Sequence, residues 1–145
     1  MNKQHIQAVR MFNRFYTSVI GLVDNHILNS KYSLPEVRIM YEVYNNPGIT
    51  ASDLINQIGM DKGYLSRILK HFKNKGIICK TLSSNDKRAT VISLSKKGIA
   101  EFKVLDKASE KQISKVFKAL SDKDCNRLIQ CMTTIKELIN IKDNE

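Results

Sequence analysis

The sequence predicts a mainly α-helical protein with one short β-hairpin near its middle. Three observations indicate this fold class. Apolar residues recur every three or four positions over most of the 145 residues, which is the period of an amphipathic helix. The two prolines, Pro35 and Pro47, stand where helices would begin or end. Two short β-prone runs, residues 77–82 and 90–94, flank the polar turn SSNDKR.

Two helices are expected before residue 50. Helical spacing of apolar residues runs through residues 4–29. Ser33 can be the N-cap of a second helix, because Pro35 fits the first turn of a helix. This helix should end before Asn46, where the sequence NPG interrupts the pattern.

A third and a fourth helix follow. Thr50 can cap the third helix through a capping box with Asp53, and Gly59 can end it in the left-handed conformation. Asp61 can cap the fourth helix, which should end at Gly76. Two helices joined by a three-residue turn that contains glycine form the helix-turn-helix pattern.

Two more helices are expected after the hairpin. Ser95 can cap a long helix whose apolar positions continue to Leu120, and Ser121 can cap the last one. The apolar stripes of the first and last helices are too long for the small segment between them to cover. We therefore expect a symmetric, intertwined dimer that buries these stripes, and a compact monomeric layer of helices is the alternative.

Nearly all of the net charge of +10 lies in one segment. Residues 60–97 contain ten Lys/Arg and two Asp/Glu, a net charge of +8, whereas residues 1–59 and 98–145 carry +1 each. So local an excess indicates a polyanionic partner. Nucleic acid is the first candidate, and an anionic membrane surface is the alternative.

Composition argues against other classes of protein. No apolar run approaches the length of a membrane span, and the N-terminus lacks the apolar core of a secretory signal. We therefore expect a cytoplasmic protein with no membrane partner. No nucleophile motif or phosphate-binding glycine loop indicates an enzyme, so neither catalytic residues nor a cofactor are expected. The histidines and cysteines lack metal-ligand spacing, and no metal site is expected.

The fourth helix carries the side chains best suited to read DNA. Its apolar residues fall on one side, and the opposite side has hydrogen-bond donors and no carboxylate. Such a helix fits the major groove of B-DNA, where these donors reach base edges. A merely solvated helix face is the alternative. The expected contact residues are Lys62, Gly63, Tyr64, Ser66, Arg67, Lys70 and Asn74.

Two further places are expected to touch DNA. Thr50 and Ser52 open the third helix, whose unpaired amides favour phosphate, and plain N-capping is an alternative compatible with this role. Lys87 and Arg88 lie at the hairpin tip, where Arg88 could enter the minor groove. An Asp86–Arg88 pair would hold the guanidinium in one orientation, and a charged turn residue is the alternative.

The order of these motifs resembles the MarR family (multiple antibiotic resistance regulators) of winged-helix transcription factors. The segment DKRA at residues 86–89 resembles the D-x-R signature of the family. The segment LSKKG at residues 94–98 resembles its L-T-x-x-G sequel, with Ser95 in place of the usual threonine. The resemblance covers essentially the whole chain.

The predicted architecture is therefore mainly α with a small β-wing. A single MarR-like domain would span residues 1–145. It would contain a winged helix-turn-helix core at about 33–97, flanked by dimerisation helices at about 4–30 and 96–141.

The resemblance also implies a function. Family members are obligate dimers that bind pseudo-palindromic DNA, most often as repressors, and small aromatic or anionic ligands often relieve repression. Arg88 would correspond to the wing arginine in the minor groove, and Asp86 to the acid that orients it. The leading hypothesis is a homodimeric, sequence-specific regulator of transcription that binds double-stranded DNA. A non-specific architectural DNA-binding protein is the alternative.

A ligand pocket is expected between the dimer helices and the winged helix, where the family has its own. Phe12, Tyr16, Tyr41 and Arg38 could line it, with Arg14 as another source of the cation. Aromatic walls with one cation would suit an aromatic acid. The alternative is that these are ordinary core and surface residues.

A redox-responsive regulator is a further alternative. It would use Cys79, Cys125 or Cys131. The peroxide-sensing members of the family carry a reactive cysteine near the N-terminus, whereas no cysteine precedes Cys79 in this chain. Three reduced, mostly buried thiols are the simpler interpretation.

Overall fold

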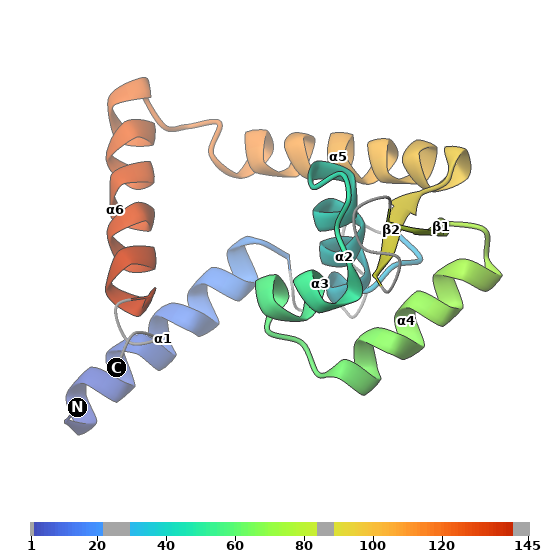
Figure 1. The fold of residues 1–145 in the computed structure, drawn as a ribbon. Coiled ribbons are helices and arrows are strands. Elements are labelled where there is room, and N and C mark those ends of the chain that lie inside the picture. Colours follow the sequence, from blue (N-terminus) through green and yellow to red (C-terminus); the bar gives the residue numbers. More distant parts are fainter. Residues whose placement is uncertain (1, 22–29, 84–88, 141–145) are drawn as a thin grey trace.

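The computed structural model describes residues 2–21, 30–83 and 89–140. In these residues it confirms a mainly α fold with a small antiparallel β-wing (Figure 1). The elements are α1 (Lys3–Val19), α2 (Leu34–Asn45), α3 (Ala51–Ile58), α4 (Lys62–Asn74), β1 (Ile78–Leu82), β2 (Thr90–Leu94), α5 (Lys96–Val116) and α6 (Asp122–Asn140).

The buried core lies in the winged helix. It is formed by α2, α3, α4, the hairpin and the first half of α5, which cluster on one side of the molecule, while α1 and α6 lie on the other side (Figure 1). Burying one large apolar side chain contributes about 1.5–3 kcal/mol, so this cluster supplies much of the stability of the described fold. Its most deeply buried large residues are Phe72, Ile39, Met40, Leu54, Leu65, Ile77 and Ile92.

Local sequence signals place the helix starts where they were predicted. Each of four predicted caps is followed by a helix that begins at the next residue. At α4, for example, the Asp61 carboxylate accepts a hydrogen bond from the Tyr64 amide at 2.9 Å. The confirmed caps are Thr50, Asp61, Ser95 and Ser121, and Glu36 accepts from the Ser33 amide and hydroxyl at the start of α2.

The hairpin is bonded to the residues that lie just before α3. Its register runs from Ile78 opposite Leu94 to Leu82 opposite Thr90. The Ile92 amide donates to the Ile49 carbonyl at 2.8 Å, which joins β2 to the residues that precede α3. The wing and the helix-turn-helix therefore form one packed unit.

The start of α5 packs closely against the residue that follows α4. The Ser95 amide donates to the Ile77 carbonyl at 2.9 Å, and the Ser95 hydroxyl donates to the Gly76 carbonyl at 2.6 Å. A Cβ atom on Gly98 would lie 2.1 Å from the Ile77 oxygen. Only glycine fits at residue 98, which explains why the segment LSKKG ends in glycine.

The first helix ends earlier than the apolar spacing predicts. The prediction of continuous helix over residues 4–29 is wrong at residues 20–21, because α1 ends at Val19 and Gly21 has a left-handed φ of 69°. The Gln112 side chain of α5 donates to the Ile20 carbonyl at 2.8 Å, so a tertiary contact stabilises this end. Residues 22–29 lie outside the described residues.

Neither a helix able to span a membrane nor a cluster able to hold a metal ion is found in the described residues. None of the helices in ranges 2–21, 30–83 and 89–140 is both long and apolar enough to cross a bilayer. Over the same ranges, no three His, Cys, Asp or Glu side chains gather in a way that could hold a metal ion.

Candidate nucleic-acid interface

Helix α4 is held by its apolar side and presents its polar side to solvent. Leu65, Ile68, Leu69 and Phe72 are buried, whereas every residue predicted to touch DNA on this helix is exposed. In Figure 1 α4 lies along the outer edge of the molecule, away from α1 and α6. The exposed set is Lys62, Gly63, Tyr64, Ser66, Arg67, Lys70 and Asn74.

The charges on this face are not neutralised within the described part of the chain. The two ion pairs found there join Lys31 to Glu101 and Arg38 to Glu42, and neither involves α4. Because Lys62, Arg67 and Lys70 have no described carboxylate partner, their full charge can act on an approaching polyanion.

One arginine of α4 has an orienting contact that the sequence analysis missed. The Arg67 guanidinium lies over the ring of Tyr64, 5.7 Å from its centroid, which is a cation–π distance. An aromatic residue three positions before an arginine is a usable signal for this pair, because i and i+3 are neighbours on a helix. The contact favours conformations of Arg67 that stay close to the first turn of α4.

Gly63 has a structural role beside the one predicted. A Cβ atom there would lie 3.2 Å from the Asp61 carboxylate oxygen that caps the helix. That distance is tighter than most contacts, so a larger residue would press on the cap. The predicted role, close approach of the backbone to DNA, stays a prediction.

At the start of α3 the side chains form the N-cap that the sequence predicts. The Thr50 hydroxyl and amide both donate to the Asp53 carboxylate, at 2.7 and 2.8 Å, and the Asp53 amide donates back to Thr50 at 3.2 Å. These hydrogen bonds from Thr50 lower the pKa of Asp53. The prediction of unpaired amides is therefore wrong for Thr50 and Asp53, while Ser52 is exposed at the same helix end.

The wing residues Asp86, Lys87 and Arg88 lie outside the described residues, so their predicted pairing stays a prediction. On either side of these residues, the Ser83 amide donates to the Ala89 carbonyl at 2.9 Å.

The four residues predicted to bind a ligand form two separate pairs. Phe12 and Tyr16 of α1 stack with ring centroids 5.7 Å apart and line an apolar groove of about 660 Å³ against α6 and the end of α5. Arg38 and Tyr41 lie on α2, where Arg38 pairs with Glu42 at 2.7 Å and lies 6.0 Å from the Tyr41 ring. Neither of these α2 residues lines the groove.

The cysteines are free and do not cluster. Cys79 on β1 and Cys131 on α6 are exposed, and Cys125 is half-buried. The expectation of mostly buried thiols is therefore wrong, because β1 and α6 turn these residues toward solvent in the single chain.

The family model and the relatives in sequence that match this chain are those of transcriptional regulators. Residues 32–90, from the residue before Ser33 to the start of β2, match the family model described as "MarR family". A putative transcriptional regulatory protein for the hcr operon of Thauera aromatica is 23% identical over 129 residues, 89% of this chain and 72% of that protein. The uncharacterised HTH-type transcriptional regulator YdgJ of Bacillus subtilis (strain 168) is 22% identical over 108 residues, 74% of this chain and 66% of that protein.

Solved structures share the fold at low sequence identity. FabT of Streptococcus pneumoniae, solved in complex with DNA, superimposes with a TM-score of 0.78 at 17% identity, over 96% of this chain and 98% of that one. Apo MarR from E. coli gives a TM-score of 0.70 at 18% identity, over 93% and 97%. BpsR of Bordetella bronchiseptica, whose DNA binding is regulated by 6-hydroxynicotinic acid, gives 0.71 at 13%, over 90% and 98%.

Proposed function

We propose that the chain, whose residues 32–90 match the model of the MarR family, is a regulator of that family and not an enzyme. It would be a homodimeric repressor that reads specific DNA with α4. The observation that carries this proposal is the exposed, carboxylate-free face of α4, with cationic and amide donors on one side of a helix. The repressor would act in the cytoplasm on a pseudo-palindromic double-stranded operator.

The composition of this face favours sequence-specific binding over the architectural alternative. Arg and Asn side chains can make paired hydrogen bonds to guanine and adenine edges in the major groove. A protein that needed only phosphate contacts would gain nothing from the mixture of Ser66, Arg67 and Asn74. Lys62 and Lys70 supply the phosphate attraction that both kinds of protein share.

The dimer is supported by the apolar residues that the single chain leaves exposed. No side chain of α1 is fully buried, and Phe15 is 64% exposed. Apolar area on this scale is costly to leave in water and is typical of a subunit interface. The exposed residues of the proposed interface are Ile6, Val9, Phe12, Phe15, Ile113, Val116, Ile129, Ile135, Leu138 and Ile139.

The proposed dimer predicts the mass of the protein in solution. Sedimentation equilibrium of the purified chain is expected to give twice the chain mass of 16.6 kDa. Two-fold symmetry would place two copies of α4 about one helical turn of DNA apart, roughly 34 Å. A mass of one chain at micromolar concentration would contradict the dimer.

We extend this arrangement to the whole chain. Residues 1–145 would act as one unit, with the winged helix-turn-helix at about 33–97 and dimerisation helices at about 4–30 and 96–141. Like BpsR, the protein would respond to a small aromatic or anionic ligand. The Phe12–Tyr16 stack offers an aromatic wall for it, and residues from a partner subunit would complete the site.

The wing supplies a pair of variants that separates two roles. Arg88→Ala is expected to weaken operator binding by about 10-fold, because a minor-groove arginine is lost from each subunit. Asp86→Ala should weaken binding less, because the arginine remains but is no longer oriented. Fluorescence anisotropy with labelled operator would measure both. Tighter binding by Asp86→Ala would mean that the carboxylate repels DNA and does not orient Arg88.

A further inference from the structure

A tyrosine that lies just before α2 connects α4 to α5. Tyr32 is 7% exposed and packs edge-on against Phe72 of α4, with the ring centroids 6.1 Å apart. Its hydroxyl donates a hydrogen bond to the Glu101 carboxylate of α5. Because Phe72 is completely buried, the ring of Tyr32 contacts the inner side of α4 while its hydroxyl is bound to α5.

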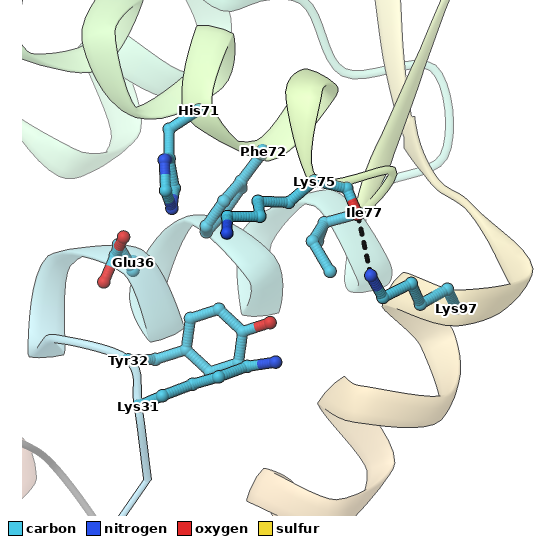
Figure 2. A pocket seen from close by; sticks show the side chains of 8 residues that line it. All are labelled: Lys31, Tyr32, Glu36, His71, Phe72, Lys75, Ile77 and Lys97. Atoms are coloured by element: carbon cyan, nitrogen blue, oxygen red, sulfur yellow. Dashed lines mark hydrogen bonds between the residues drawn. The ribbon is translucent and has the colours of Figure 1, made fainter.

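The Glu101 carboxylate is shielded from solvent and bound by two neighbouring residues. Its side chain is 22% exposed, and the oxygen that accepts from Tyr32 also lies 3.0 Å from the Lys31 ammonium. That ammonium is 5.3 Å from the centroid of the Tyr32 ring. Figure 2 shows the side chains of Lys31 and Tyr32 extending side by side toward α5. The residues before α2 therefore bind α5 through one carboxylate.

At neutral pH Tyr32 is protonated and Glu101 is ionised. Burial, followed by the hydrogen bond to Glu101 and its charge, raises the pKa of Tyr32. Burial alone would raise the pKa of Glu101, but hydrogen bonds from Tyr32 and Lys31, with the charges of Lys31 and Lys97, outweigh it and lower that pKa. The phenol thus donates to a charged acceptor, and such a hydrogen bond is stronger than one between neutral groups.

Helix α5 connects the winged helix to the side of the molecule that holds α1 and α6. Its first half is buried against the winged helix through Phe102 and Leu105. In its second half Gln112 donates to the Ile20 carbonyl after α1, and Ile113 is exposed in the proposed dimer interface. Figure 1 shows α5 running from the hairpin toward α6. The angle between the winged helix and α5 would therefore set the position of α4 in the proposed dimer.

Two directional contacts along α5 fix this angle. The first is at the start of the helix, where the Ser95 amide donates to the Ile77 carbonyl at 2.9 Å. The second is the hydrogen bond from Tyr32 to Glu101, six residues or roughly 9 Å further along the helix. The apolar contacts between them are non-directional, so they hold the two surfaces together without fixing their angle.

We propose that Tyr32 and Glu101 are positioning residues for DNA recognition, and that their hydrogen bond sets the half-site spacing that the protein accepts. This inference rests on the dimer and the function proposed above. With the bond in place, the two copies of α4 would be held at one separation, which matches one half-site spacing. Without it, each winged helix would adopt several angles to α5, and only a fraction of the dimers would match the operator before binding.

Operators of altered spacing test this role. Tyr32→Phe removes only the hydroxyl, and Tyr44→Phe makes the same change at an exposed residue of α2 as a control. Fluorescence anisotropy would compare the natural operator, the same operator with one base pair inserted between the half-sites, and a single half-site. We expect Tyr32→Phe to weaken binding to the natural operator about 10-fold and to the lengthened operator less. Binding to the single half-site should stay within about 2-fold, because α4 itself is unchanged.

Substitution of Glu101 tests whether the two residues act through one bond. Glu101→Gln removes the charged acceptor, and Glu110→Gln makes the same change at an exposed residue of α5 as a control. Glu101→Gln is expected to weaken binding to the natural operator and to reduce the preference for its spacing, as Tyr32→Phe does. The double variant should be no weaker than the weaker single variant, because residues that share one interaction are not additive.

The position of α4 can also be measured without DNA. Lys73 is an exposed residue of α4 outside the predicted DNA contacts. A spin label attached there through a ketone amino acid leaves the native cysteines unlabelled. Electron–electron resonance of the DNA-free dimer is expected to give a narrow distribution of label separations for the parent protein and for Tyr44→Phe, and a broader one for Tyr32→Phe.

Several results would overturn the positioning role. They are equal weakening of all three duplexes by Tyr32→Phe, additive losses in the double variant, and label separations that Tyr32→Phe leaves unchanged. The first of these is what a merely destabilised protein would give, because its folded fraction falls for every duplex alike. If the parent protein selects no DNA, the function proposed above fails, but the label separations still show whether the bond positions α4.

Discussion

Gly98→Ala is expected to destabilise the protein by roughly 3 kcal/mol, a large effect for the addition of one methyl group. The added Cβ would lie 2.1 Å from the Ile77 oxygen and 3.1 Å from its carbonyl carbon. Backbone atoms cannot rotate away as a side chain can. The same oxygen accepts a hydrogen bond from the Ser95 amide at 2.9 Å, so moving it would also weaken the bond that anchors the N-cap residue of α5.

Chemical denaturation followed by circular dichroism would measure this loss, at one protein concentration because a dimer unfolds in a concentration-dependent way. Gly48→Ala is a matched control. Gly48 has a left-handed φ of 89° but open space around it, so alanine there meets backbone strain alone, worth about 1 kcal/mol. If Gly98→Ala cost no more than Gly48→Ala, the close packing of α5 on Ile77 would be wrong.

Arg67→Ala is expected to weaken binding to the natural operator by about 10- to 100-fold and to reduce the preference for it over other DNA, as loss of a bidentate base contact does. The proposed dimer would carry this arginine twice, so the change would act on both half-sites. Exposure of Arg67, its contact with Tyr64 and its place in the first half of α4 all suit major-groove reading.

The substitution Arg67→Lys distinguishes contact of residue 67 with a base from its contact with a phosphate. Lysine keeps the charge but lacks the planar fork that pairs with a base edge. Titration of the operator and of a scrambled duplex should show that Arg67→Lys loses preference nearly as fully as Arg67→Ala. Equal affinity losses on both duplexes for Arg67→Ala, restored by lysine, would assign Arg67 to a phosphate instead.

The features that could be predicted from the sequence are the local ones. The capping box of Thr50 and Asp53, the Ser95 cap and the hairpin strands depend on residues within a few positions of each other, and the structure has each of them in place. The polar face of α4 followed from the helical period, which fixes the side of the helix on which each residue lies.

The features that could not be predicted depend on contacts between distant segments. Apolar spacing continues past Val19, but α1 ends there, and its end is stabilised by a hydrogen bond from Gln112, 92 residues from its partner Ile20. A cavity of about 260 Å³ at the C-terminal end of α4 is lined by Lys31, Lys75 and Lys97 (Figure 2), and no spacing in the sequence brings Lys31 to Lys75. Gly98 could be recognised in the sequence as part of a motif. The need for glycine there becomes clear only from its close packing against Ile77.

The predicted site residues also fall into a local group and a group that depends on packing. The α4 residues were predicted as a set because one helix carries them all. The ligand residues were drawn from α1 and α2, and their relative placement depends on the packing of those two helices, for which the sequence offers no local rule. The structure separates Phe12 and Tyr16 from Arg38 and Tyr41.

Sequence-specific binding is the central claim, and fluorescence anisotropy tests it most directly. The full chain would be titrated against a labelled duplex from its own upstream region and against a scrambled duplex of equal length, at two salt concentrations. A specific repressor should bind the natural duplex about 10³-fold more tightly and keep that preference at the higher salt. Equal binding of both duplexes, lost together as salt rises, would show that counterion release is the whole effect and would contradict specific recognition by α4.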